Sequence, residues 1–196
     1  MSGVPLEAFS VYGIELEYML VDRQTLDVRA IADTILPEAQ QAAKATSDAT
    51  EIHGAIDWSN ELALHVIEIK NLRPGPLAGL SEAFQKQITS LDAHLARANA
   101  CLMPSAMHPW MDPTRETKLW PHDDEAIYAT FHRLFNCNRH AWSNVQSMHV
   151  NLPFADDQQF EKLIAAATAA LAASPLPAIR GGGSRSVSRL QHLRNI

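Results

Sequence analysis

Hydrophobic and polar residues alternate most clearly in three segments of the chain, residues 11–21, 62–72 and 145–152. A period of two residues is typical of a β-strand that buries one face and exposes the other. In the first segment Glu15 and Glu17 share one face, and large apolar residues share the opposite face. Pro74 and Pro76 end the second segment, because proline cannot donate a hydrogen bond to a neighbouring strand. These patterns predict three strands.

Apolar residues recur at steps of three and four in residues 77–98, which predicts an amphipathic helix. Two further helices are predicted after capping aspartates, one after Asp123 or Asp124 and one after Asp156. Residues 101–107 are predicted to form a short strand. This order of elements is typical of an α+β fold, with a mainly antiparallel sheet and helices packed on one face.

The composition is that of an ordinary globular protein, because 46% of the 196 residues are hydrophobic and 19% are charged. No apolar run reaches the roughly 18 residues that are needed to cross a bilayer. The first twenty residues lack the features of an export signal. Cys101 and Cys137 have no zinc-type spacing and are expected to be free thiols. We therefore expect a cytoplasmic protein that does not act at a membrane.

Charge is distributed unevenly along the chain. The net charge is −6, yet residues 179–196 contain four arginines and no acidic residue. The acidic remainder argues against nucleic acid as a partner. Residues 174–196 are rich in Pro, Gly, Ser and Arg and show no periodic face. We predict that they form a disordered tail after a domain that comprises residues 1–173.

Three predicted strands carry ionisable or hydrogen-bonding side chains on one face. These side chains are Glu15 and Glu17, then Glu68 and Lys70, then Ser147, His149 and Asn151. If the strands are neighbours, their carboxylates repel one another unless a cation lies between them. Mg²⁺ prefers oxygen ligands, and an imidazole ligand makes the site compatible with Mn²⁺ as well. A solvated polar face of the sheet explains the same pattern, so both interpretations stand.

Several other residues fit either a site or a structural role. Asp57, Asn60 and Glu61 are candidate ligands, or they belong to a turn before the second strand. Three tryptophans are candidates for lining a pocket, or for core packing and loop anchoring: Trp110, Trp120 and Trp142. Arg115 is a candidate cation for a phosphate or carboxylate, or one partner of a surface ion pair. Motifs of phosphate loops, dinucleotide-binding folds and HExxH metalloproteases are absent from the sequence.

Four segments follow one another in an order that is familiar from one protein family. They are Gly13–Glu17 (GIELE), Ser59–Lys70 (SNELALHVIEIK), Pro104–Trp110 (PSAMHPW) and Trp142–Pro153 (WSNVQSMHVNLP). Together they resemble glutamate–cysteine ligase family 2, whose members are carboxylate–amine ligases. The resemblance extends over residues 11–153.

The resemblance implies a glutamine-synthetase-like catalytic fold, whose antiparallel sheet curves into a funnel, and an ATP-dependent ligase of glutathione biosynthesis. ATP would phosphorylate the γ-carboxylate of glutamate, and the amine of cysteine would attack the acyl phosphate. By position, Glu15, Glu17, Glu68 and His149 would hold Mg²⁺ at the ATP phosphates, and the three glutamates would be the catalytic residues. Lys70 and Arg115 would be candidates for stabilising the phosphoryl charge, and Asn151 for contacting the cofactor.

The resemblance fades near Ala170, whereas the second half of family members adds more sheet, carboxylates and arginines. We therefore expect a shortened family member that holds part of an active site. Two interpretations stand beside an active ligase. The first is a non-catalytic remnant that binds metal or nucleotide and self-associates through an unpaired sheet edge. The second is a metal-dependent hydrolase that uses the same carboxylates with an activated water.

Overall fold

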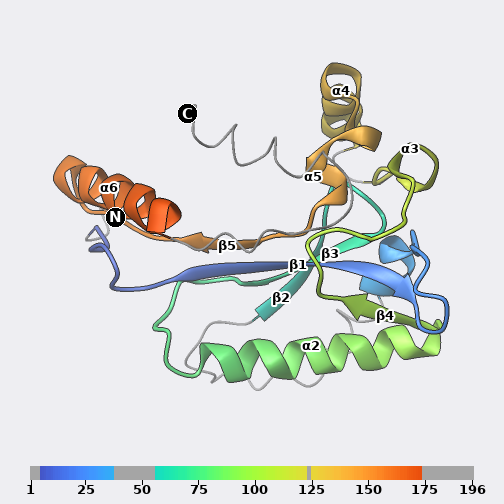
Figure 1. Cartoon of the computed structure of the whole chain (residues 1–196). Helices are drawn as coiled ribbons and strands as arrows, with labels where there is room; N and C mark the ends of the chain where they lie inside the picture. Colours follow the sequence, from blue (N-terminus) through green and yellow to red (C-terminus); the bar gives the residue numbers. More distant parts are fainter. Residues whose placement is uncertain (1–4, 38–55, 123–124, 174–196) are drawn as a thin grey trace. The chain divides into compact units, whose positions relative to one another are not determined.

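The structure, a computed structural model, describes residues 5–37, 56–122 and 125–173 (Figure 1). The chain forms two compact units, residues 1–155 and residues 156–196. The predicted tail at 174–196 and the predicted cap at Asp123 or Asp124 lie outside the described residues.

The first unit is built around an open five-stranded antiparallel sheet (Figure 1). Its strands are β1 (Gly13–Asp22), β2 (Ile56–Asn60), β3 (Val66–Asn71), β4 (Ala100–Met103) and β5 (Met148–Asn151). The order is β2-β3-β1-β4, and β5 pairs with β1. One edge of β1 is therefore shared, because β5 pairs with residues 13–16 and β4 pairs with residues 19–22.

The predicted α+β fold with an antiparallel sheet is confirmed. The interpretation of residues 57–60 as a turn is wrong, because these residues belong to β2, which pairs with β3. The physical reason is the burial of Trp58, which lies opposite Ile69 and is 1% exposed. A side chain of this size stabilises a strand that carries it into the core.

Helix α2 (Leu80–Arg97) packs on one face of the sheet (Figure 1). Its apolar stripe buries Leu80, Phe84, Leu91 and Leu95, as the spacing predicts. The stripe joins residues of the sheet and of the helical segment 32–37 in one core: Leu20, Ala32, Ile35, Leu36, Trp58, Ile67, Ile69 and Ala100. Each fully buried Leu, Ile or Phe contributes about 1.5–3 kcal/mol to folding. This packing fixes which face of β1 and β3 is apolar, and so which face carries the polar residues.

The connection between β4 and β5 forms short helices on the side of the sheet opposite α2 (Figure 1). They are α3 (Pro113–Glu116), α4 (Glu125–Phe135), the 3₁₀ helix η1 (Cys137–Arg139) and α5 (Ala141–Asn144). A buried hydrogen bond from Thr117 Oγ1 to Asn144 Oδ1 (2.7 Å) joins the end of α3 to α5. The helix predicted after Asp123 or Asp124 is present as α4, but it lies on the side of the sheet opposite α2 (Figure 1), whereas the patterns predicted helices on one face only.

The second unit contains α6 (Asp157–Ala173). Asp156 caps it, as predicted, because its Oδ1 accepts a hydrogen bond from the backbone N–H of Gln159 (2.8 Å). Among the described residues of the whole chain, no helix combines the length and the apolar character that a membrane span requires.

Candidate functional site

Strand β1 places its two glutamates beside polar residues of both neighbouring strands. Glu17 lies opposite Glu68 of β3. Glu15 lies opposite Lys70 of β3 on one edge and opposite His149 of β5 on the other. Directly opposite residues of antiparallel strands share a face, with Cβ atoms about 4.5–5.5 Å apart. The three predicted polar faces therefore form one surface of the sheet.

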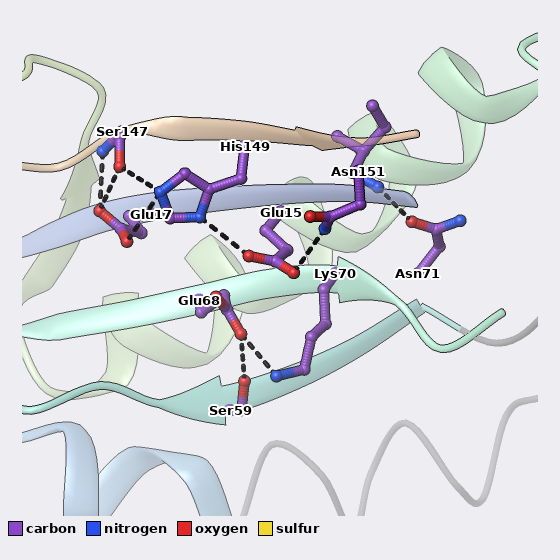
Figure 2. A network of polar contacts seen from close by, with 10 residues as sticks. Glu15, Glu17, Ser59, Glu68, Lys70, Asn71, Ser147, His149 and Asn151 are labelled. Carbon is purple, nitrogen blue, oxygen red and sulfur yellow. Dashed lines mark hydrogen bonds and ion pairs between the residues drawn. The ribbon is translucent and has the colours of Figure 1, made fainter. Parts of the chain in front are cut away.

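Glu68 is the most enclosed carboxylate of this surface, with 8% of its side chain exposed. Its Oε1 accepts hydrogen bonds from Ser59 Oγ (3.0 Å) and Lys70 Nζ (2.6 Å), as Figure 2 shows. Burial alone would lower the pKa of Lys70, but the hydrogen bond to Glu68 and the surrounding negative charges raise it. Glu17, opposite Glu68, is 12% exposed. Like charges that lie directly opposite destabilise a sheet, and Lys70 is bound to Glu68 rather than to Glu17.

Glu61 follows β2 and adds a third carboxylate at this place. Burial and the negative charges of Glu68 and Glu17 raise the pKa of Glu61 from 4.5 to about 7. A hydrogen bond from the backbone N–H of Leu62 (3.3 Å) offsets part of this effect. The site therefore resists a third negative charge at neutral pH.

A second set of contacts connects Glu15 to β5 (Figure 2). His149 Nδ1 lies 2.8 Å from Glu15 Oε2, and Asn151 Nδ2 donates to Glu15 Oε1 at 2.8 Å. These groups are more exposed, at 29% for the Glu15 side chain and 45% for His149. Burial would raise the pKa of Glu15, but the hydrogen bonds to His149 and Asn151 and the charges of His149 and Lys70 lower it.

Ser147, just before β5, holds Glu17 with two hydrogen bonds. Its backbone N–H and its hydroxyl both lie within bonding distance of Glu17 Oε2, at 2.7 and 3.0 Å. The same hydroxyl lies 2.8 Å from His149 Nε2. These contacts leave the second oxygen of Glu17, Oε1, turned toward His149 Nε2 at 3.9 Å.

Two small features allow the end of β5 to approach β1. Gly13 lies opposite Asn151, and a Cβ atom at position 13 would come within 3.1 Å of Asn151 Cβ. Asn71 Oδ1 accepts a hydrogen bond from the backbone N–H of Ile14 (2.7 Å), which holds the first part of β1 against β3. The Asn151 side chain can therefore reach Glu15.

Two overlapping groups of side chains have the chemistry of a cation site. We call them the inner group, which is Glu17, Glu61 and Glu68, and the outer group, which is Glu15, Glu68 and His149. Within each group one ligand atom per residue lies within 4.8 Å of the others. Neighbouring ligand atoms around octahedral Mg²⁺ lie about 3 Å apart and opposite ones about 4 Å apart. The residues present therefore fit a divalent cation after small side-chain rotations.

The described residues do not support nucleophilic catalysis. Ser147, His149 and Glu15 form a hydrogen-bonded series like that of a serine hydrolase. However, the carboxylate of Glu17 binds the same serine, and its charge would repel a developing oxyanion. Burial raises the pKa of both free thiols, Cys101 and Cys137, which disfavours the reactive thiolate.

The remaining predicted residues have different surroundings. Arg115 is exposed on α3 and is not part of the network in Figure 2, so its role stays a prediction. The three tryptophans have separate neighbours, which agrees with packing and anchoring rather than a shared pocket. Trp110 donates to Asp27, Trp120 packs against the core, and Trp142 contacts Phe135 and His140.

Strand β2 and the contacts of Ser59 and Ser147 with the glutamates were not predicted from the sequence. Ser59 and Glu61 belong to the site because β2 is a strand, and the alternation of Ile56 and Trp58 with Asp57 and Ser59 is the signal that predicts it. The sequence does not show which carboxylate oxygen of Glu17 accepts the hydrogen bonds from Ser147.

Comparison with known proteins assigns the region around this site to a protein family. The model of glutamate–cysteine ligase family 2 matches residues 11–180, which include the whole network and the first residues of the segment predicted to be a tail. An uncharacterized protein of Archaeoglobus fulgidus is 33% identical over 111 residues, or 56% of this chain. The chain covers 30% of that relative's length.

Proposed function

The chain belongs to glutamate–cysteine ligase family 2, and from this membership we propose that it joins the γ-carboxylate of glutamate to an amine at the expense of ATP. The family indicates carboxylate–amine ligase chemistry in general. The finer proposal is that cysteine is the acceptor amine and that the reaction passes through an acyl phosphate. We further propose that the cation is Mg²⁺, with Mn²⁺ as a substitute.

The observation that supports the proposal is that two enclosed carboxylates, Glu17 and Glu68, lie directly opposite each other, with Glu61 beside them. Three carboxylates at one place cost free energy when they are all ionised, as the raised pKa of Glu61 indicates. A bound divalent cation supplies charge neutralisation and alignment of the phosphates. The acidic surface would then accept the polyanion ATP, which it would repel without the cation.

The residues of the chain would divide the work according to their positions. The inner and outer groups would hold the cations and share Glu68 between them. Lys70 is the cation next to Glu68 and would face the transferred phosphoryl group. Asn151 and Arg115 remain proposed contacts of the nucleotide or substrate.

The proposal is tested by ADP release from the purified full chain with Mg²⁺, glutamate and cysteine. The expected result is turnover that requires both glutamate and the amine and is lost in the double variant Glu15→Ala/Glu17→Ala. Glu161→Ala, an exposed substitution on α6, is the matched control and should retain full turnover. A folded chain without amine-dependent ADP release would contradict the ligase proposal.

The same samples distinguish the two alternatives. A non-catalytic family member is the main competitor, and it would bind Mn²⁺ without turning over ATP. A metal-dependent hydrolase would cleave a substrate without ATP. Light scattering on the same sample measures the self-association expected of an open sheet edge.

A further inference from the structure

The hydroxyl group of Ser147 lies between a residue of the inner group and a residue of the outer group. Its Oγ is 3.0 Å from Glu17 Oε2 and 2.8 Å from His149 Nε2 (Figure 2). The other ring nitrogen of His149, Nδ1, is 2.8 Å from Glu15 Oε2. One continuous series of contacts thus joins Glu17, Ser147, His149 and Glu15.

We propose that Ser147 is a positioning residue that fixes the tautomer of His149 when a cation is bound, so that Nδ1 carries the lone pair that faces the outer group. This inference rests on the proposed cation site and adds a residue that acts on it through His149. Ser147 would also hold Glu17 in place, and would therefore orient one ligand of each group.

The number of protons that these groups can donate limits the direction of each contact. An ionised carboxylate only accepts hydrogen bonds, and a hydroxyl group has one proton to donate. If that proton goes to Glu17 Oε2, then Ser147 Oγ must accept one from His149 Nε2–H. In the cation-free chain a proton on Nδ1 accounts for the contact with Glu15. A bound cation would replace that proton, and the single N–H of the neutral imidazole would then be Nε2–H, which leaves the lone pair of Nδ1 facing Glu15 and the cation.

The contact between Nδ1 and Glu15 completes this arrangement when a cation is bound. Two acceptors 2.8 Å apart repel one another unless a proton or a cation lies against both. The distance is close to the roughly 3 Å between neighbouring ligand atoms of Mg²⁺. A metal-binding histidine commonly donates its second ring N–H to a fixed acceptor, which sets the ring orientation, and Ser147 Oγ is that acceptor here.

The opposite arrangement is chemically distinct. If the hydroxyl donated to His149 Nε2, then Nδ1–H would donate to Glu15, and Nδ1 would have no lone pair for a cation. Glu17 would keep only the bond from the backbone N–H of Ser147. The two arrangements differ in the location of one proton, which nitrogen-15 NMR of the imidazole ring detects directly.

The experiment measures two properties of the full chain, the tautomer of His149 in saturating Mg²⁺ and the affinity for Mn²⁺. The variants are Ser147→Ala and the conservative Ser147→Thr, which keeps the hydroxyl. The matched control is Ser105→Ala, because Ser105 is an exposed serine whose hydroxyl donates to the carbonyl of Met107. None of these measurements depends on turnover.

We expect the Nε2–H tautomer in the unmodified chain and in Ser147→Thr, and a mixture of tautomers in Ser147→Ala. Loss of an orienting partner typically weakens metal binding roughly 10- to 100-fold, and Ser147→Ala should do so while Ser105→Ala does not. An Nδ1–H tautomer in the Mg²⁺-bound chain, or unchanged affinity in Ser147→Ala, would overturn the inference and leave the proposed function intact. Failure of the unmodified chain to bind either ion would overturn both.

Discussion

The inner group contains three glutamates, the outer group contains two glutamates and a histidine, and their surroundings have opposite effects on the pKa of a glutamate. In the inner group, burial and like charges raise the pKa of Glu61 to about 7. In the outer group, the partners of Glu15 outweigh its burial and lower its pKa. The difference shows that the environment, not the residue type, decides where an additional positive charge is needed.

The physical origin of the difference is the supply of hydrogen-bond partners. Strand β5 brings a histidine and an amide to Glu15, on the exposed side of the site. In the inner group, Ser59 of β2 and Lys70 of β3 both bind Glu68. We infer that a cation stabilises the inner group more than the outer group, because fewer of its charges are compensated by the protein.

The largest expected effect comes from removing the carboxylate that both groups share. Glu68→Gln should weaken Mn²⁺ binding by more than about 100-fold, beyond the loss typical of an orienting partner. Glu15→Gln should weaken it less, because Glu15 belongs to the outer group alone. Calorimetric titration of the two variants and of Glu161→Gln as the control measures the difference. Equal losses in both would refute the distinction between the groups.

The second effect concerns His65, a buried titratable group just before β3. Burial, with a smaller contribution from His108, lowers its pKa from 6.5 to about 4. Neither ring nitrogen has a partner in hydrogen-bond geometry among the described residues, although the backbone of Ser143 offsets part of the burial effect.

The sign of the pH dependence follows from linkage. Between pH 6.5 and 4 the unfolded chain binds the proton and the folded chain does not, so stability is complete above pH 6.5 and falls below it. The loss at pH 5 should be about 2 kcal/mol. Urea unfolding at pH 7.5, 6 and 5, in the presence of a metal chelator, measures this loss of stability. His65→Gln should remove this part of the pH dependence, and an unchanged slope in that variant would contradict the assignment.

The third effect is the contribution of Glu61 in the inner group to stability. The pKa of Glu61 is higher in the folded chain than its usual value of 4.5. Without cations, the stability of the folded chain therefore falls as the pH rises from 4.5 to 7. Glu61→Gln should therefore stabilise the metal-free chain at pH 8 by about 1–2 kcal/mol. The variant and Glu161→Gln are compared by urea unfolding. Destabilisation by Glu61→Gln would show that repulsion among the three carboxylates does not destabilise the folded chain.

The smallest effect is expected in the outer group. Asn151→Ala removes one hydrogen bond to Glu15 at an exposed place, so it should cost less than about 1 kcal/mol of stability. It should also raise the pKa of Glu15, because the amide stabilises the ionised form. Carboxyl NMR titration of the metal-free chain measures this shift, and a further decrease in the pKa would contradict the role of Asn151.

Elements that depend on local sequence could be predicted without the structure. Alternation along β1 places Glu15 and Glu17 on one face because successive side chains of a strand point to opposite sides. Spacing of three and four residues identifies the buried stripe of α2, and Asp156 identifies the start of α6. The four family-like segments contain every residue of the inner and outer groups.

Tertiary structure alone decided how these faces meet. The pairing of Glu17 with Glu68 depends on the register between β1 and β3, and a shift of one residue would turn the side chains of one strand away. Ser147 binds Glu17 across 130 residues of sequence, and no local pattern encodes which oxygen accepts the bond. The charge balance of the site is a property of distances and burial, which arise only when the strands are brought together and the core excludes water.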